Sequence, residues 1–203
     1  MPARTPAPNR WTCRHLPHVD APGHFQHVAF HLADSLPRAA LLRMERDLAH
    51  LPAYQRSQTK ARRIEVMLDA GRGSCLLAQP TCARIMVETL LFGDGTRYQL
   101  HAWVVMPNHV HVLVRQDENH PLSRIVQSWK RHSSREIRRL GNDANRQTAG
   151  PHAGIWQRDY WDRYIRNDRH FAAVEEYIRL NPVKAGLVPT PEDWPYGSAG
   201  RGE

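Results

Sequence analysis

Two histidines separated by a single residue are the first feature of this sequence that could do chemistry. His109 and His111 lie in the stretch HAWVVMPNHVHVLVR, residues 101–115, in which two apolar runs flank a short Pro-Asn turn. Because side chains alternate between the two faces of a strand, these imidazoles would stand side by side while the intervening valines point into a core. Two imidazoles in this arrangement can share one divalent metal ion. The same pattern also occurs as two polar residues on a solvated strand, so the rest of the chain must decide between these interpretations.

A tyrosine and an asparagine near the C-terminal end form a second candidate pair. Tyr177 and Asn181 are four residues apart, so they share one face of a helix expected over residues 169–180. Without a metal, they would be a packing tyrosine and a helix-ending cap before Pro182. With the two histidines, the amide oxygen would complete a three-ligand metal site that leaves positions open for a phosphate oxygen. The metal would act as a Lewis acid on the phosphoryl group, and the tyrosine, its phenolate favoured by the metal and local cations, would be the nucleophile.

The elements that must position these residues follow from the hydrophobic periodicity. We expect strands near residues 25–33, 97–106, 110–115 and 156–165, and helices over 37–70 with a break at Pro52, after Pro80, from Pro121 and over 169–180. The order β-α-β-β-α-β predicts an α+β protein with the ferredoxin-like split arrangement, an antiparallel sheet with helices packed on one face. The other face of the central strands would carry the histidines. The last helix should stop at Asn181 because a residue before proline avoids the helical conformation.

Three segments are expected along the chain. Residues 1–23, rich in Pro, Arg and His, are interpreted as a basic, extended N-terminal arm. Residues 24–190 would form the catalytic domain. Residues 191–203 would be a tail of irregular chain that packs back on the body.

The charge of the chain points to a nucleic-acid partner. Its 203 residues carry a formal net charge of +8, and a polyanion is the simplest partner for such a surface. The helix expected after Pro121 has an apolar stripe of Leu122, Ile125, Val126, Trp129, Ile137 and Leu140. Its other face could follow a phosphate backbone with Arg124, Lys130, Arg131, Arg135, Arg138 and Arg139. Trp156 and Trp161 could stack on unpaired bases, with core packing as the alternative for each.

The cysteine count and hydropathy indicate where the protein works. The three cysteines form no CxxC pair, which suggests reduced thiols in a cytosolic protein. We find no apolar leader and no apolar run of the length of a membrane span, so no membrane partner is expected. The predicted location is the cytoplasm, in association with the nucleoid.

Three segments together resemble one family. PNHVHV at 107–112, WQRDYWDRYIRN at 156–167 and YIRLNPVKAGL at 177–187 are similar to the REP-associated tyrosine transposases, relatives of the single-tyrosine HUH transposases of small bacterial insertion sequences. The likeness covers roughly residues 15–199. The HxH pattern alone is weak, but HxH followed at this distance by the other two segments is specific.

The resemblance implies a function and a set of roles. The family cuts single-stranded DNA at short sequences beside imperfect hairpins, through a 5′-phosphotyrosine intermediate and a free 3′-OH, with Mg²⁺ or Mn²⁺. His109 and His111 match the metal ligands of the family, and Tyr177 matches the nucleophile. Asn181 stands where insertion-sequence relatives carry a glutamine ligand, so its reach is one methylene shorter.

Several alternatives remain open at this stage. Tyr164, and after it Tyr160, are competing candidates for the nucleophile. The protein could instead be a non-catalytic binder of single-stranded nucleic acid, in which the histidines are incidental. A different metalloenzyme is set aside, because Leu113 stands where the metallo-β-lactamase pattern requires Asp and the Glu of the cupin pattern is missing. We expect a monomer rather than a dimer, single-stranded DNA hairpins as partners, and no small-molecule cofactor beyond the metal.

Overall fold

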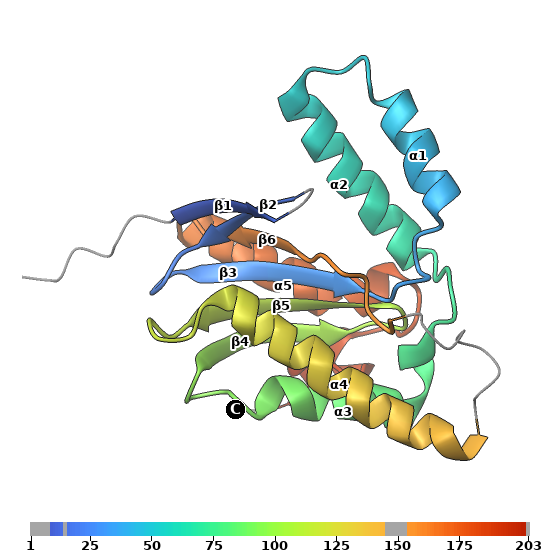
Figure 1. The fold of residues 1–203 in the computed structure, drawn as a ribbon. Helices are drawn as coiled ribbons and strands as arrows, with labels where there is room; N and C mark the ends of the chain where they lie inside the picture. The colour runs from blue at the N-terminus through green and yellow to red at the C-terminus, as the bar shows by residue number, and fades with distance from the viewer. Residues whose placement is uncertain (1–8, 14–15, 145–153, 202–203) are drawn as a thin grey trace, which may run out of the picture.

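A four-stranded antiparallel sheet lies at the centre of the protein (Figure 1). It is seen in a computed structural model that describes residues 9–13, 16–144 and 154–201. The strands lie in the order β4-β5-β3-β6 and are β3 (Phe25–His31), β4 (Tyr98–Val105), β5 (His109–Gln116) and β6 (Trp161–Tyr164). With helices between β3 and β4 and between β5 and β6, this is the predicted α+β, ferredoxin-like β-α-β-β-α-β arrangement.

The two faces of β5 separate the core from the histidines. Val110, Val112 and Val114 are fully buried in the main hydrophobic core, as the alternating pattern predicts. His109 and His111 lie on the opposite face. In the register with β3, His31 pairs with His109, Ala29 with His111 and His27 with Leu113. Partners in an antiparallel pair share a face, so the central strands bring four histidines to one side of the sheet.

Two helices cover the valine face of the sheet, α3 (Pro80–Leu91) and α4 (Leu122–Ala144). The predicted apolar stripe of α4 is buried as far as Ile137, and Trp129 packs against Tyr98 and Phe30. Leu140, predicted to belong to that stripe, is instead 45% exposed. Figure 1 gives the reason, because the C-terminal part of α4 runs past the sheet.

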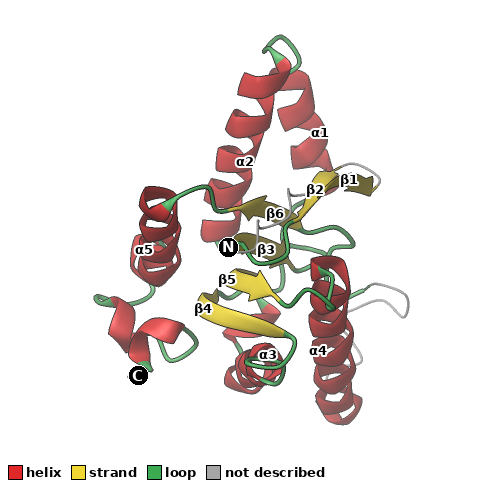
Figure 2. Ribbon diagram, turned by 90° about the vertical axis from the view of Figure 1, so that its left-hand side faces the viewer, coloured by secondary structure: helices red, strands yellow, loops and turns green. Residues whose placement is uncertain are grey.

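The helix α5 (Asp168–Lys184) packs on the histidine face, so the helices do not all lie on one side of the sheet as expected (Figure 2). A second hydrophobic cluster joins α5 to the sheet and contains Ala102, Val104, Met106, Leu113, Ile165, Val174 and Ile178. The histidine face is therefore closed by a helix rather than open to solvent.

The helix α5 also continues past the point where it was expected to stop. Asn167 caps its N-terminus by accepting a hydrogen bond from the His170 amide (2.9 Å). At the other end Pro182 lies inside the helix, and Ala185 is the C-cap. Ile178 and Asn181 are almost completely buried, and this packing outweighs the local preference of a residue before proline. Asn181 is thus a helical residue directed into the protein, not a helix-ending cap.

The helices α1 (Arg38–Asp47) and α2 (Ala53–Asp69) form a hairpin that stands out from the sheet (Figure 1). They are separated at Pro52, as the sequence predicts. The chain then returns through a short 3-10 turn, η1 (Leu76–Ala78), to α3. No helix in the described part of the chain is both long and apolar enough to cross a membrane.

The segments outside this frame are more ordered than expected. Strands β1 (Asn9–Cys13) and β2 (Leu16–Asp20) form a hairpin where an extended arm over 1–23 was expected, and residues 1–8 and 14–15 lie outside the described residues. The buried His18 of β2 contacts Asp162 of β6. The tail contains η2 (Pro191–Asp193) and η3 (Ser198–Gly200) and packs on β4, as predicted.

Candidate active site

Two histidines of β5 and a tyrosine of α5 meet between the sheet and the helix. The Tyr177 hydroxyl lies 3.5 Å from Nε2 of His111, and the two ring centres are 5.2 Å apart. The ring of His109 lies 4.9 Å from that of His111. Both imidazoles are almost completely buried, whereas Tyr177 is half-buried. The structure therefore brings together, within one chain, the three residues expected to carry the chemistry.

Asn181 completes this group from one helical turn beyond Tyr177. It lies close enough to His109 and to Tyr177 to influence the pKa of each. Its side chain is 1% exposed, and its Oδ1 has no hydrogen-bond partner. Leaving a buried amide oxygen unpaired costs about 1–3 kcal/mol, so this oxygen is available to an additional group.

Two neighbours fix which nitrogen of each imidazole faces the site. Nδ1–H of His109 donates to Oδ1 of Asn108 (2.7 Å), which leaves the Nε2 lone pair free. His111 makes the corresponding contact through Nδ1 to Nε2 of His27 (3.1 Å), so its Nε2 faces Tyr177. Partners of this kind orient metal-ligating histidines and fix their tautomers.

The electrostatic surroundings keep the imidazoles neutral and the phenol protonated. Burial lowers the pKa of His109 and of His111 well below the usual value, so both carry a lone pair at neutral pH. Burial, followed by the carboxylates of Glu65 and Asp69, raises the pKa of Tyr177. The ammonium of Lys184 lies 5.1 Å from the centre of the Tyr177 ring. The described groups thus favour the neutral phenol, in contrast to the expectation that local cations favour the phenolate.

The unpartnered atoms of the site fit a divalent cation. Nε2 of His109, Oδ1 of Asn181 and Oδ1 of Asp69 are buried and lack a hydrogen-bond partner. Each can offer a lone pair, and imidazole nitrogen with amide or carboxylate oxygen is a donor set that suits Mn²⁺ and Mg²⁺. In the residues that the structure describes, no three His, Cys, Asp or Glu side chains already stand at metal-binding geometry. The fit therefore depends on the amide of Asn181 or on a small movement of Asp69.

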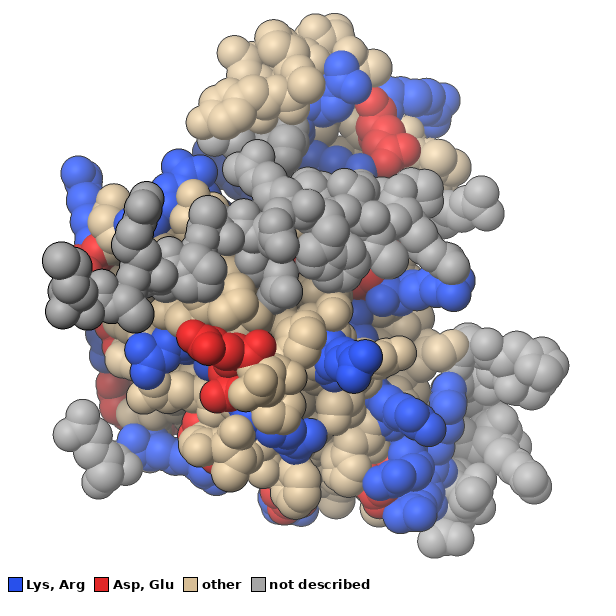
Figure 3. Space-filling model, turned by 60° about the vertical axis from the view of Figure 1, so that its left-hand side comes forward, with Lys and Arg blue, Asp and Glu red and all other residues tan. Residues whose placement is uncertain are grey.

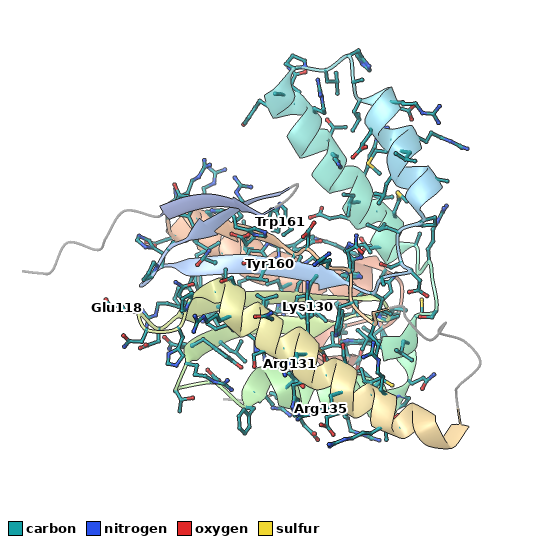
Figure 4. All side chains as sticks on the ribbon, in the orientation of Figure 1. Glu118, Lys130, Arg131, Arg135, Tyr160 and Trp161 are labelled. Atoms are coloured by element: carbon teal, nitrogen blue, oxygen red, sulfur yellow. The ribbon has the colours of Figure 1, made fainter. Side chains whose placement is uncertain are left out.

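Lys130 was expected on the DNA-binding face of α4 but points into the protein instead. Its ammonium donates to the carbonyls of Gln157 (3.1 Å) and Asp159 (2.8 Å) and lies over the rings of Phe30 and Tyr160. Figure 4 shows Lys130 on the side of α4 that faces Tyr160. These contacts fix the segment before β6 as a loop. The strand expected over residues 156–165 is therefore shorter and covers Trp161–Tyr164.

The other cations of α4 remain exposed. Arg135 and Arg139 both pair with Glu136, at 2.9 and 3.0 Å. The exposed set is Arg124, Arg131, Arg135, Arg138 and Arg139. Figure 3 shows a group of Lys and Arg side chains on the side of the molecule where α4 lies. Five of the six predicted cations thus form a surface that a phosphate backbone can reach.

The aromatic residues separate into core and site. Trp156 is 7% exposed, donates to Ser133 Oγ (2.9 Å) and packs against Phe30, so the expectation that it stacks on bases is wrong. Trp161 is half-buried, and its ring lies 5.0 Å from that of His27, beside the site.

Of the competing nucleophiles, Tyr160 packs against His18 with ring centres 4.2 Å apart. Tyr164 lies against His24, at 6.4 Å. The structure brings Tyr177, rather than these two, against His111.

Four further residues of the site were not identified from the sequence. His27 lies on the face of β3 that pairs with the face of His111, and the alternation in FQHVAFHLA is the signal that could have found it. Glu65 and Asp69, four residues apart on α2, are close enough to act on Tyr177. Asn108 was assigned only to the turn. No local pattern links α2 to β5, since their contact depends on how the chain returns to the sheet.

Comparisons with known proteins find similar transposases. Residues 91–181, which contain the four residues predicted for catalysis and metal binding, match the family described as Transposase IS200 like. The chain is 34% identical over 106 residues to a Haemophilus influenzae protein named for the REP-associated tyrosine transposases, covering 50% of this chain and 58% of the relative. It is 32% identical over 101 residues to the REP-associated tyrosine transposase of Escherichia coli K12, covering 50% and 54%. The chain thus spans little more than half the length of these relatives.

A solved structure of a REP-associated tyrosine transposase bound to a REP hairpin shares the fold. The TM-score is 0.54 at 18% identity, and the superposition covers 92% of this chain and 82% of that chain.

Proposed function

We propose that this chain, which is similar to the REP-associated tyrosine transposases, cuts and rejoins single-stranded DNA beside hairpins through a 5′-phosphotyrosine intermediate. One observation carries the proposal. The Tyr177 hydroxyl lies 3.5 Å from His111, in a buried site that His109 and Asn181 complete within the same chain. The relative solved with a REP hairpin supports hairpins of that type as the substrate.

The chemistry requires a phenol, a phosphate and a positive charge. His109, His111 and Asn181 would hold a Mg²⁺ or Mn²⁺ ion, which when bound offsets negative charge on the phosphoryl oxygens and on the phenol oxygen. The Tyr177 oxygen attacks phosphorus and releases its proton to water. The bond from phosphorus to the 3′ oxygen breaks, that oxygen takes a proton, and DNA leaves as a free 3′-OH. The reverse attack by a 3′-OH on the phosphotyrosine rejoins the strand.

The surroundings of Tyr177 agree with a nucleophile that is inactive until the site is complete. Burial and two carboxylates hold the phenol in its neutral form, so the hydroxyl is a weak nucleophile by itself. The position of Tyr177 is fixed by its neighbour in α5, because Ile178 is fully buried against the sheet. Arginines along α4 and the half-buried Trp161 would hold the substrate strand by charge and by stacking.

The proposal is tested by searching for the covalent adduct. The substrate is a labelled oligonucleotide with an imperfect stem-loop and a randomised single-stranded flank, incubated with Mn²⁺. Wild type should form a protein–DNA adduct that survives denaturing electrophoresis, and Tyr177→Phe should form none. Because the contact of the hydroxyl with His111 is long, at 3.5 Å, this variant should fold and bind the stem-loop like wild type.

The matched control is Tyr164→Phe, which removes a hydroxyl from a half-buried tyrosine of β6. It should retain the adduct, and an adduct that survives in Tyr177→Phe but not in Tyr164→Phe would refute the assignment. Binding without any cleavage by wild type, unaffected by a chelator, would instead support the non-catalytic binder that the charge of +8 also allows. We propose a monomer, since one chain supplies the complete site. We also propose that it is located at the nucleoid, where its DNA substrate lies.

A further inference from the structure

The end of α2 is fixed beside the candidate active site. The side-chain amide of Asn108 donates to the carbonyls of Leu68 and of Arg72, both at 3.0 Å. The same side chain accepts from Nδ1–H of His109. Asn108 therefore links the backbone on both sides of Asp69 to the imidazole of His109.

Asp69 places an unpaired oxygen close to the candidate metal ligands. Its Oδ1 is buried, has no hydrogen-bond partner and lies 3.8 Å from Nε2 of His109, which also lacks one. A distance of 3.8 Å is too long for a hydrogen bond between them. Oδ1 of Asn181 is the third unpaired atom of the site. These three buried atoms each carry a lone pair and no hydrogen, so they cannot hydrogen-bond to one another. A cation bound between them could accept all three lone pairs.

We propose that Asp69 is an additional ligand of the divalent cation, supplied by α2 and not by the sheet or α5. This inference rests on the proposed function. Two atoms about 2.1 Å from one octahedral cation lie roughly 3.0 Å apart when adjacent and roughly 4.2 Å apart when opposite. The separation of Asp69 and His109 falls between these values. A shift of less than about 1 Å would therefore bring these two atoms to the spacing of adjacent ligands.

Charge gives Asp69 a role that the other ligands cannot fill. His109, His111 and Asn181 are neutral donors, and hard cations such as Mg²⁺ and Mn²⁺ are held in proteins mainly by carboxylate oxygens. Glu65 lies one turn before Asp69 and is close enough to interact with it, so it adds negative charge near the site. Glu65 is consequently the natural control, since it changes the charge without removing the proposed ligand.

The test is a Mn²⁺ titration of the full chain without DNA, in which the free ion is measured by electron paramagnetic resonance. We expect Asp69→Ala to weaken Mn²⁺ binding at least tenfold, as His109→Ala should. We expect Glu65→Gln to weaken Mn²⁺ binding by threefold or less, which is the effect of the lost charge alone. The unfolding temperature in EDTA should not fall in Asp69→Ala or Asp69→Asn, because the removed oxygen has no partner.

The possible outcomes distinguish a failure of the Asp69 assignment from a failure of the proposed metal site. Wild-type Mn²⁺ affinity in Asp69→Ala, together with its loss in His109→Ala, would overturn the assignment of Asp69 and leave the proposed metal site intact. The absence of Mn²⁺ binding by wild type would overturn both. If Asp69→Ala loses stability in EDTA as well as Mn²⁺, and Asp69→Asn loses neither, Asp69 has a structural role and the inference is wrong.

Discussion

Replacing Asn108 should damage the fold and the proposed metal site together, because its side chain contacts both the end of α2 and His109. Its Oδ1 accepts from His109 at 2.7 Å, and its Nδ2 donates to the Leu68 and Arg72 carbonyls at 3.0 Å. The residue is 1% exposed. Asn108→Ala removes all three hydrogen bonds and leaves the partner groups without the amide.

The size of the effect follows from these contacts. A buried hydrogen bond contributes about 0.5–1.5 kcal/mol, and a partner left unpaired costs about 1–3 kcal/mol. Since Arg72 is exposed and its carbonyl can turn to water, we expect Asn108→Ala to lower the free energy of unfolding by about 2–5 kcal/mol. For a chain of this size, that corresponds to a fall in Tm of about 5–15 °C. Loss of the group that orients a ligating histidine weakens metal binding by roughly 10–100-fold.

The assay combines urea unfolding in EDTA with Mn²⁺ titration of the folded variants. Asn108→Asp separates the two roles, because a carboxylate still accepts from His109 but cannot donate to the two carbonyls. We expect it to be as unstable as Asn108→Ala while its Mn²⁺ affinity falls by less than about tenfold, because His109 keeps an acceptor for Nδ1–H. Wild-type Mn²⁺ affinity in Asn108→Ala, measured on folded protein, would refute the idea that Asn108 orients His109.

Two further predictions concern Lys130 and the two tryptophans that were candidates for DNA binding. Burial lowers the pKa of Lys130 to about 8, so between pH 8 and the ordinary lysine value of 10.5 the unfolded chain binds more protons than the folded one. In this range the free energy of unfolding of wild type should therefore rise with pH relative to that of Lys130→Met, by on the order of 1 kcal/mol per pH unit. Urea unfolding at several pH values measures both proteins. A difference between the two free energies that does not change with pH would contradict this prediction. Trp156→Ala should lower the unfolding free energy by about 3–5 kcal/mol, and its folded fraction should bind single-stranded DNA normally. Trp161→Ala should instead weaken that binding by about 1–3 kcal/mol in a fluorescence titration, and the opposite pattern would reverse the two assignments.

The sequence predicts the parts of the site that depend on a single period. The period of two in a strand places His109 and His111 on one face, and the spacing of four in a helix places Tyr177 beside Asn181. The predicted order of strands and helices is also correct. These two elements meet because α5 packs on the histidine face, which the expectation of helices on one face did not include.

What could not be predicted depends on tertiary packing. Pro182 was expected to end α5, but the burial of Ile178 and Asn181 keeps the chain helical through it. Lys130 follows the helical period of the basic face, yet carbonyls of a distant segment attract it inward. Asp69 lies 3.8 Å from His109 at the end of α2, which hydrogen bonds from Asn108 hold against the sheet.

The contacts made by the two ends of the described chain also close the sheet. The outer strand on one side, β6, is met by β2 through His18 and Asp162. The outer strand on the other side, β4, is met by the tail, where Val105 N–H donates to the Tyr196 carbonyl (2.8 Å) and Trp103 N–H to Ser198 Oγ (3.0 Å). Strands with unpaired outer edges recruit other chains and promote aggregation. With both outer strands covered in this way, the sheet offers fewer unpaired edges to a second copy of the chain, which agrees with the proposed monomer.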